Sequence, residues 1–239
     1  KFLIKDLGSL NGVYVNGSKL SGTKTISKKD NIFISKYLLK IDGRAKDLSD
    51  ELAISAIGIE KAYPNQKKGE KALHKMDLSV PSKSLLAIMG PSGCGKSTLL
   101  KSLNGEHRLS KGRVLIFNQN LYDNYEYLKT QIGYVPQDDI VHKQLSVYDS
   151  LRYTAKLRIA NISDDEIDIR IKKVLSDLNI SDIKDKLNGK ISGGQRKRVS
   201  IAIELLTEPM LLFLDEATSP LDPGTIEEFL IMLRKLSEN

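Results

Sequence analysis

The fold of this 239-residue chain is decided by the stretch Gly90-Pro91-Ser92-Gly93-Cys94-Gly95-Lys96-Ser97-Thr98. The stretch fits the pattern G-x-x-x-x-G-K-[ST], whose glycines let the backbone wrap closely around phosphate oxygens because no Cβ stands in the way. An apolar run over residues 85–89 precedes it and a helical pattern over residues 96–103 follows it. This is the strand–loop–helix context that the motif requires. We therefore predict a phosphate-binding loop over residues 90–98.

The positions of this loop carry different expected roles. Backbone amides and the N-terminus of the following helix attract anionic phosphate groups. Lys96 is expected to reach the β- and γ-phosphates, and Ser97 is expected to ligate Mg²⁺. Cys94 stands at a variable position of the motif, so we interpret it as structural rather than redox-active. The predicted nucleotide-binding residues here are Gly90, Ser92, Gly93, Cys94, Gly95, Lys96, Ser97 and Thr98.

A second constellation is a pair of carboxylates after an apolar run. Residues 210–214 read Met-Leu-Leu-Phe-Leu, as expected for a strand buried on both faces of a parallel sheet, and Asp215 and Glu216 follow directly. Ligands of open α/β sheets bind at this edge of the sheet. Asp215 can orient Mg²⁺ through water, and Glu216 can take a proton from an attacking water molecule. Together with the phosphate loop, the pair predicts nucleotide hydrolysis.

The pattern of the chain changes near residue 53. Residues 1–45 are β-rich and carry the turn pairs Asn11-Gly12 and Asn16-Gly17, with no helical period. We interpret residues 46–52 as a linker and residues 53–239 as an α/β domain in which strands and helices alternate. The expected strands are 2–5, 13–15, 32–35, 37–41, 54–60, 85–89, 114–117, 132–135 and 210–214. A capping box beginning at Ser163 opens one helix, and another is expected from Asp222 to about Leu236.

Composition and charge exclude several classes of protein. A membrane-spanning helix needs ~20 consecutive apolar residues, and the longest apolar run is far shorter. A single cysteine excludes an internal disulfide. The net charge is +7, and the first 50 residues hold ten Lys or Arg against five Asp. These cations are scattered, so we expect a solvated basic surface and no nucleic-acid partner, while a nearby membrane or an acidic partner stays open.

The stretch Ser192-Gly193-Gly194-Gln195 precedes a helix with Val199, Ala202, Ile203 and Leu206 on one face, and Ser192 is placed to cap it. A phosphate loop, this S-G-G-Q and an L-L-F-L-D-E strand in that order resemble the ATP-binding cassette (ABC) family over roughly residues 52–239. The resemblance implies an α/β P-loop NTPase cassette, a mixed sheet with a helical subdomain, that hydrolyses ATP with Mg²⁺.

The resemblance also assigns individual residues. Gln137 is similar to the glutamine that senses Mg²⁺ and the γ-phosphate. The resemblance implies that Glu216, Lys96 and Gln137 are the catalytic residues. It also implies that Ser97, Gln137 and Asp215 bind the metal. Asp222 resembles the D-loop aspartate, and Tyr63 the aromatic residue that stacks on adenine. A second cassette is implied as partner, in a head-to-tail dimer. There Ser192, Gly193, Gly194 and Gln195 of one copy complete the nucleotide site of the other.

Finer resemblances suggest a place for the cassette. Residues 133–139 and 145–158 resemble the White-type, or G, subfamily, whose cassettes are followed by fused transmembrane helices, implying a site on the cytoplasmic face of the cell membrane. Asp6-Leu7-Gly8-Ser9-Leu10-Asn11-Gly12 resembles the second half of a forkhead-associated (FHA) domain, a β-sandwich that reads phosphothreonine. We expect a partial sandwich of about five strands over residues 1–45 that is marginal in isolation, with a phosphothreonine peptide as partner.

One departure concerns a switch histidine that the family carries some thirty residues after the catalytic glutamate. His74, His107 and His142 all precede Asp215. We therefore expect a cassette that binds ATP and hydrolyses it weakly. Two alternatives to a transporter ATPase stay open: a soluble ABC ATPase, and an adaptor in which the FHA-like part binds phosphothreonine. The sequence does not identify the transported substrate or the direction of transport.

Overall fold

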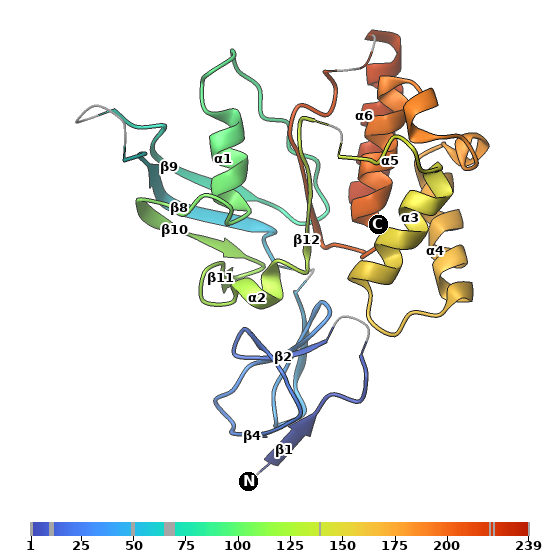
Figure 1. Ribbon diagram of the computed structural model, residues 1–239. Coiled ribbons are helices and arrows are strands. Elements are labelled where there is room, and N and C mark those ends of the chain that lie inside the picture. Colours follow the sequence, from blue (N-terminus) through green and yellow to red (C-terminus); the bar gives the residue numbers. More distant parts are fainter. Residues whose placement is uncertain are drawn as a thin grey trace. The chain divides into compact units, whose positions relative to one another are not determined.

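The structure is a computed structural model that describes residues 2–9, 12–48, 51–64, 70–138, 140–219, 221 and 223–238. The chain divides into two compact units (Figure 1). The first comprises Lys1–Leu7 and Gly12–Ile132 and contains most of the β-rich N-terminal region together with the phosphate loop. The second comprises Gly8–Asn11 and Gly133–Asn239 and contains the C-terminal helices and the acidic strand end.

The N-terminal region consists of short antiparallel strands, as the sequence predicts. Strands β1 and β4 form one sheet, and a second sheet has the order β3-β2-β5-β6-β7. The β2–β3 turn contains Asn16 and Gly17 with φ angles of 52° and 80°, which confirms the hairpin predicted from this pair. The strands are β1 (Phe2–Lys5), β2 (Val13–Val15), β3 (Ser18–Lys19), β4 (Thr23–Ile26), β5 (Ile32–Ile34), β6 (Tyr37–Leu39) and β7 (Ala45–Asp47).

The core of this region comes from alternate residues of these strands. Val13, Val15 and Ile32 are buried with Leu20 and Ile26. In its described part the region has seven strands, which corrects the expectation of about five. The segment predicted as a linker, residues 46–52, overlaps β7, which pairs with β6 and is followed by the buried Leu48. Residues 45–47 form a strand because the edge of β6 is available to pair with them. The composition of the segment gave no indication of this pairing.

Within the first unit, the N-terminal region contacts α2 (Tyr125–Leu128). The Tyr127 ring stacks on Phe33 with ring centroids 4.5 Å apart, and its hydroxyl donates to the Ser35 carbonyl oxygen at 2.7 Å. Tyr14 lies against the same ring at 5.5 Å. Tyr127 is 1% exposed, and this burial raises the pKa of its hydroxyl. The β-rich region and the start of the cassette therefore share a buried aromatic cluster.

The rest of the first unit is an antiparallel sheet with the helix α1 over it (Figure 1). The strand order is β11-β10-β8-β9, and α1 follows the phosphate loop. Buried residues of β8 and β10, among them Ile59 and Val114, form the centre of this layer. The elements are β8 (Ile54–Lys61), β9 (Leu73–Val80), α1 (Lys96–Leu103), β10 (Lys111–Ile116) and β11 (Gln119–Asn120).

The strand predicted over residues 85–89 is wrong in this structure. The segment has no strand assignment, and Leu85, Leu86 and Met89 are 37%, 49% and 90% exposed. An apolar run becomes a strand only when a neighbouring strand accepts and donates its backbone hydrogen bonds. Among the described residues of the first unit, no strand pairs with this segment. Its apolar sequence therefore gives no strand within that unit.

The second unit combines a pair of strands with a group of helices. Strand β12 (Ile132–Val135) pairs with β13 (Leu211–Leu214), and α3, α4 and α5 pack on one another. Three of the four β13 residues are half-buried rather than buried, which corrects the expectation of burial on both faces. The helices are α3 (Val147–Arg158), α4 (Asp164–Asp177), α5 (Gly193–Leu205) and α6 (Pro223–Glu238), with short 3-10 helices at Ser181–Ile183 and Asn188–Lys190.

The amphipathic helix predicted after Ser163 is confirmed as α4. The Ser163 hydroxyl accepts from the Glu166 amide, and the Glu166 carboxylate accepts from the Ser163 amide, which completes the predicted capping box. The apolar positions Ile167, Ile171 and Val174 are buried in the core of the second unit. Helix α4 therefore begins and faces inward as its sequence specifies.

Candidate functional site

The phosphate loop has the backbone conformation that its glycines predict. Gly95 has a φ of 100° and caps α1, and a Cβ there would lie 2.9 Å from the Ala72 carbonyl oxygen. Gly93 has a φ of 78° with open space around it. Both angles lie in the left-handed region that favours glycine. The loop thus brings its backbone close to Ala72 at Gly95 and faces open space at Gly93.

Lys96 is the first residue of α1, and its side chain folds back over the loop. Its Nζ donates to the carbonyl oxygens of Gly90 and Pro91 at 2.8 and 2.9 Å. Ser97 and Thr98 follow in the first turn and are half-exposed, and no acidic residue lies there. Ser92 and Cys94 are exposed. An ammonium and helix N-terminal amides at one place attract an anion such as phosphate.

Tyr63 also lies in the first unit, where its position is fixed by two neighbours. Its hydroxyl is 2.8 Å from Nδ1 of His107, and the two rings meet edge to face at 5.7 Å. The Lys61 ammonium lies 4.9 Å from the centroid of the tyrosine ring. His107 was not predicted, because the contact joins residues 44 positions apart and no local pattern indicates it.

The acidic strand end lies in the second unit, after β13. The Asp215 amide donates to the Val135 carbonyl oxygen at 3.0 Å, and the Asp215 side chain is buried and accepts from the Tyr134 hydroxyl at 3.3 Å. Glu216 is exposed and has a φ of 49°, a strained conformation for a residue with a Cβ. Such strain concentrates at functional sites.

Gln137 reaches the same place from the loop after β12. Its Nε2 donates to Oε2 of Glu216 at 2.8 Å, although the two residues are 79 positions apart. The structure therefore brings together three predicted site residues, Gln137, Asp215 and Glu216. Their side chains offer oxygen atoms, which are the ligands that Mg²⁺ prefers. In the described part of the chain, no group of three or more His, Cys, Asp or Glu forms a metal cluster.

The S-G-G-Q stretch begins α5, as predicted. The Ser192 hydroxyl accepts from the Gln195 amide at 3.2 Å, and the Gln195 side-chain oxygen accepts from the Ser192 amide at 3.1 Å. Ser192 is exposed, and Gly193 follows it as the first residue of the helix. A Cβ on Gly194 would lie 2.5 Å from the Leu221 side chain, so a larger residue there would displace Leu221. Asp222, the predicted D-loop residue, lies outside the described residues.

One buried cation near this site was missed. Lys197 on α5 is 1% exposed, and its Nζ donates to the carbonyl oxygens of Pro136 and Gln137 at 3.0 and 2.8 Å. Lys197 shares a buried face of α5 with Ser200, Ile201 and Glu204, three, four and seven residues later. Because most of these positions are polar, the sequence pattern did not indicate that this face is buried. Tyr134, the partner of Asp215, was also missed, because its contact joins residues 81 positions apart.

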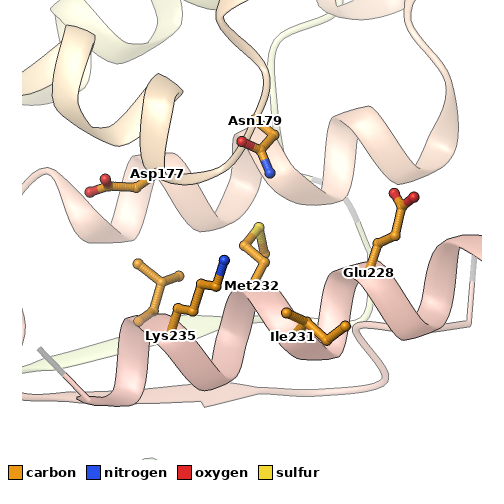
Figure 2. A pocket seen from close by; sticks show the side chains of 7 residues that line it. Asp177, Asn179, Glu228, Ile231, Met232 and Lys235 are labelled. Carbon is orange, nitrogen blue, oxygen red and sulfur yellow. The ribbon is translucent and has the colours of Figure 1, made fainter.

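A groove elsewhere in the second unit lies between the end of α4 and α6 (Figure 2). Its volume is about 540 Å³. None of the predicted site residues lines it. The residues that line it are Asp177, Asn179, Glu228, Ile231, Met232, Lys235 and Leu236.

A glycine-rich loop that leads into an α-helix, with a lysine at the helix start, defines a P-loop nucleotide-binding protein. Comparisons with known proteins identify the family. The ABC transporter family model matches residues 73–219, and the FHA domain model matches residues 1–35. The chain therefore belongs to the ABC transporter family, whose cassette binds and hydrolyses ATP, and its N-terminal region is FHA-like.

Relatives agree with this assignment. The chain is 36% identical over 244 residues to an ABC transporter ATP-binding/permease protein of Mycobacterium tuberculosis, covering 98% of this chain and 28% of that protein. It is 41% identical over 163 residues to a broad substrate specificity ATP-binding cassette transporter of Bos taurus, covering 64% of this chain and 24% of that protein. The chain thus spans about a quarter of the length of these relatives.

A solved structure gives the same fold. The protein cbiO1 from Clostridium perfringens, part of the ABC transporter complex cbiONQ, superposes with a TM-score of 0.71 at 30% identity, covering 79% of this chain and 74% of that chain. No helix in the described part of this chain is both long and apolar enough to cross a membrane.

Proposed function

We propose that this chain is the ATP-driven part of a membrane transporter, with ATP and Mg²⁺ held by the phosphate loop and the acidic strand end. The observation that carries the proposal is the contact between Gln137 and Glu216 beside the buried Asp215. A carboxylate held at the end of a strand by an amide suits the activation of water in phosphoryl transfer.

The phosphate groups of ATP have a clear set of partners. The backbone amides of residues 92–98 face them, and Lys96 exchanges its two carbonyl contacts for the β- and γ-phosphate oxygens. Ser97, Gln137 and Asp215 supply oxygen atoms for Mg²⁺, which neutralises phosphate charge when bound. Tyr63 stacks on the adenine base, with His107 holding its hydroxyl.

The chemical step needs a proton acceptor near the γ-phosphate. A water molecule attacks the γ-phosphorus and transfers its proton to the Glu216 carboxylate. The bond between the γ-phosphorus and the bridging oxygen breaks, and ADP and phosphate leave. Gln137 orients the Glu216 carboxylate through the 2.8 Å hydrogen bond.

Two copies of the cassette act together in this proposal. Ser192 is exposed at the N-terminus of α5, and its helix amides suit a γ-phosphate held by another copy. The ATP molecules then join the two cassettes head to tail, and hydrolysis releases them. Asp222 is proposed to lie at the same dimer interface.

Nucleotide-dependent association tests the proposal. Glu216→Gln keeps the contact with Gln137 and removes the base, so we expect this variant to form a dimer with MgATP in analytical ultracentrifugation and to stay monomeric with MgADP. Adding Ser192→Arg at the exposed helix start should abolish the dimer while leaving ATP binding intact. A monomer at saturating ATP, or a dimer that survives Ser192→Arg, would contradict the head-to-tail arrangement.

The membrane role rests on the relatives. We propose a transmembrane domain as partner, fused downstream of the cassette, and a position on the cytoplasmic face of the cell membrane. Two relatives, an ATP-binding/permease protein and an ATP-binding cassette transporter, support this. A hydropathy scan of the parent gene beyond this segment tests it. About six long apolar segments are expected, and a polar continuation would favour a separate membrane partner or a soluble ABC ATPase.

A regulatory partner is proposed for the FHA-like region. The family match over residues 1–35 favours a phosphothreonine peptide bound there, which would bias the attached cassette. Titration of the parent protein with a phosphothreonine peptide library tests this. Binding that disappears when the same peptides are dephosphorylated is expected, and equal binding of both forms would contradict it.

A further inference from the structure

The second unit contains a buried cation that the proposed chemistry does not use. Lys197 lies five residues after Ser192 on α5, and its side chain is 1% exposed. A buried ammonium is costly unless hydrogen bonds replace its water. Here the carbonyl oxygens of Pro136 and Gln137 accept from Nζ at 3.0 and 2.8 Å. Lys197 is therefore held by the backbone of the loop that follows β12.

The two carbonyl groups that accept from Lys197 lie in the loop that carries Gln137. They belong to the residues directly after β12, which ends at Val135. Val135 accepts from the Asp215 amide at 3.0 Å, so the start of this loop is fixed against the acidic strand end. Two residues later, the Gln137 side chain donates to Glu216 at 2.8 Å. Lys197 thus holds the backbone of the residue whose side chain meets Glu216.

Other charges on α5 are differently engaged. Glu204, which is 7% exposed, pairs with Arg158 of α3 at 2.9 Å, and Arg196 donates to the Ile191 carbonyl oxygen at 2.6 Å. The first contact joins α5 to α3, and the second stays local to the start of α5. The Lys197 contacts instead reach the loop that carries Gln137. Lys197 therefore links the helix that begins after Ser192 to the carboxylate of Glu216, through one intervening residue.

We propose that Lys197 is a positioning residue that holds Gln137 against Glu216 and couples α5 to the acidic strand end. The functional part of this inference rests on the proposed ATPase function. The positioning part rests on the geometry alone. A shift of α5 would move the Gln137 backbone through the Nζ of Lys197. Binding of a γ-phosphate at the N-terminus of α5 and the orientation of Glu216 are therefore linked.

The side-chain amide of Gln137 reports the positioning directly by nuclear magnetic resonance of the nitrogen-labelled chain without nucleotide. Gln137→Ala assigns the signal by its disappearance. Lys197→Met keeps the length of the side chain and removes the ammonium. We expect it to shift the Gln137 amide in the same direction as Glu216→Ala does, because both changes break the amide–carboxylate contact.

A matched control separates positioning from stability. Arg158→Met removes the cation that pairs with Glu204, so it also weakens a contact of α5, and it should leave the Gln137 signal in place. Lys197→Gln retains a donor for one carbonyl group and should give an intermediate shift, which serves if Lys197→Met does not fold. An unmoved Gln137 signal in a folded Lys197 variant, or failure of both variants to fold, would overturn the proposal.

Affinity for MgATP then separates this inference from the proposed function. Lys197→Met should weaken MgATP binding by about tenfold, and should add little in a Gln137→Ala background, because the two residues act through one contact. A displaced Gln137 signal with unchanged MgATP affinity would leave the positioning intact and contradict the role of Gln137 at the nucleotide. Additive losses in the double variant would contradict the coupling.

Discussion

Gly95 illustrates how single residues determine the phosphate loop. Its φ is 100°, and a Cβ at this position would lie 2.9 Å from the Ala72 carbonyl oxygen, which leaves no room for a side chain. Gly93 shares the left-handed backbone but faces open space. The two positions therefore separate the cost of a left-handed φ from the cost of a steric contact.

We predict that Gly95→Ala destabilises the chain more than Gly93→Ala does. Each variant places a Cβ at a positive φ, which costs roughly 1–3 kcal/mol. Gly95→Ala adds the contact with backbone oxygen that Gly93→Ala lacks. Urea unfolding of both variants measures the difference. Equal unfolding free energies would show that the approach to Ala72 does not constrain the loop.

Tyr63 gives a second prediction at the level of a residue. If its ring stacks on adenine, Tyr63→Ala should weaken ATP binding by about 1–3 kcal/mol, the usual scale of base–aromatic stacking, and should leave inorganic tripolyphosphate unaffected. Tyr63→Phe, which keeps the ring, should bind ATP nearly as well as the wild type. Calorimetric titrations measure both ligands, and an equal loss for both would contradict stacking.

Several site residues could be read from the sequence, and others could not. Lys96, Asp215 and Glu216 lie within continuous motifs, so local spacing was sufficient to predict them. Tyr134 and His107 act through partners 81 and 44 residues away, and only tertiary structure creates those contacts. Gln137 was named from its family resemblance, and the structure adds its partner Glu216.

At the level of elements, α4 shows how a capping box responds to pH. Hydrogen bonds from the Ser163 amide and hydroxyl hold the pKa of the Glu166 carboxyl below its usual value. A lowered folded-state pKa contributes stability above the unfolded-state value, and this contribution is lost as the pH falls through the folded-state pKa. The start of α4 should therefore weaken in acid.

We predict that Glu166→Gln lowers the unfolding temperature near neutral pH and that the difference from the wild type shrinks as the pH falls through the folded-state pKa of Glu166. Once Glu166 is protonated, both side chains are uncharged, so they differ little. Thermal unfolding followed by circular dichroism over a series of pH values from neutral to acid measures this. A difference that persists in acid would assign the effect to packing rather than to the carboxylate charge.

Helix α2 gives a second prediction for an element, because Tyr127 fills the contact with Phe33, Tyr14 and Ser35. Tyr127→Ala should cost about 3–5 kcal/mol of unfolding free energy, and Tyr127→Phe about 1 kcal/mol through the lost hydrogen bond. Tyr125→Ala on the same helix is the control, since Tyr125 is 36% exposed. Equal effects at both positions would contradict a specific interface.

Sequence patterns predicted most elements correctly and failed where a neighbour decides the outcome. The helix over residues 96–103 and the strand over 132–135 were predicted with their observed bounds. Residues 85–89 are apolar, yet without a paired neighbour in the described part of their unit they form no strand. Residues 45–47 include two charged residues, Lys46 and Asp47, yet they pair with the edge of β6 as β7. Pairing depends on tertiary context that composition does not carry.

At the scale of the whole molecule, the division into compact units differs from the division drawn from sequence patterns. The sequence patterns separate residues 1–45 from residues 53–239, whereas one compact unit, Lys1–Leu7 with Gly12–Ile132, holds most of the FHA-like region and the first half of the cassette. The buried aromatic cluster at Tyr127 explains why the two regions form one unit. Its rings Phe33 and Tyr127 stack on each other although they are 94 residues apart in the sequence. The phosphate loop belongs to one of these units and the acidic strand end to the other.

The phosphate loop is expected to bind ATP through Lys96. Calorimetric titration with MgATP of the wild type and the Lys96→Ala variant tests this most directly. Lys101→Ala is the control, because Lys101 lies on the same helix and pairs with Glu106. Loss of charge-assisted contacts at Lys96 should cost roughly 1.5–3 kcal/mol, a factor of about ten to a hundred in Kd. Lys101→Ala should bind like the wild type. Equal affinities for all three proteins, or no binding by the wild type, would contradict the account.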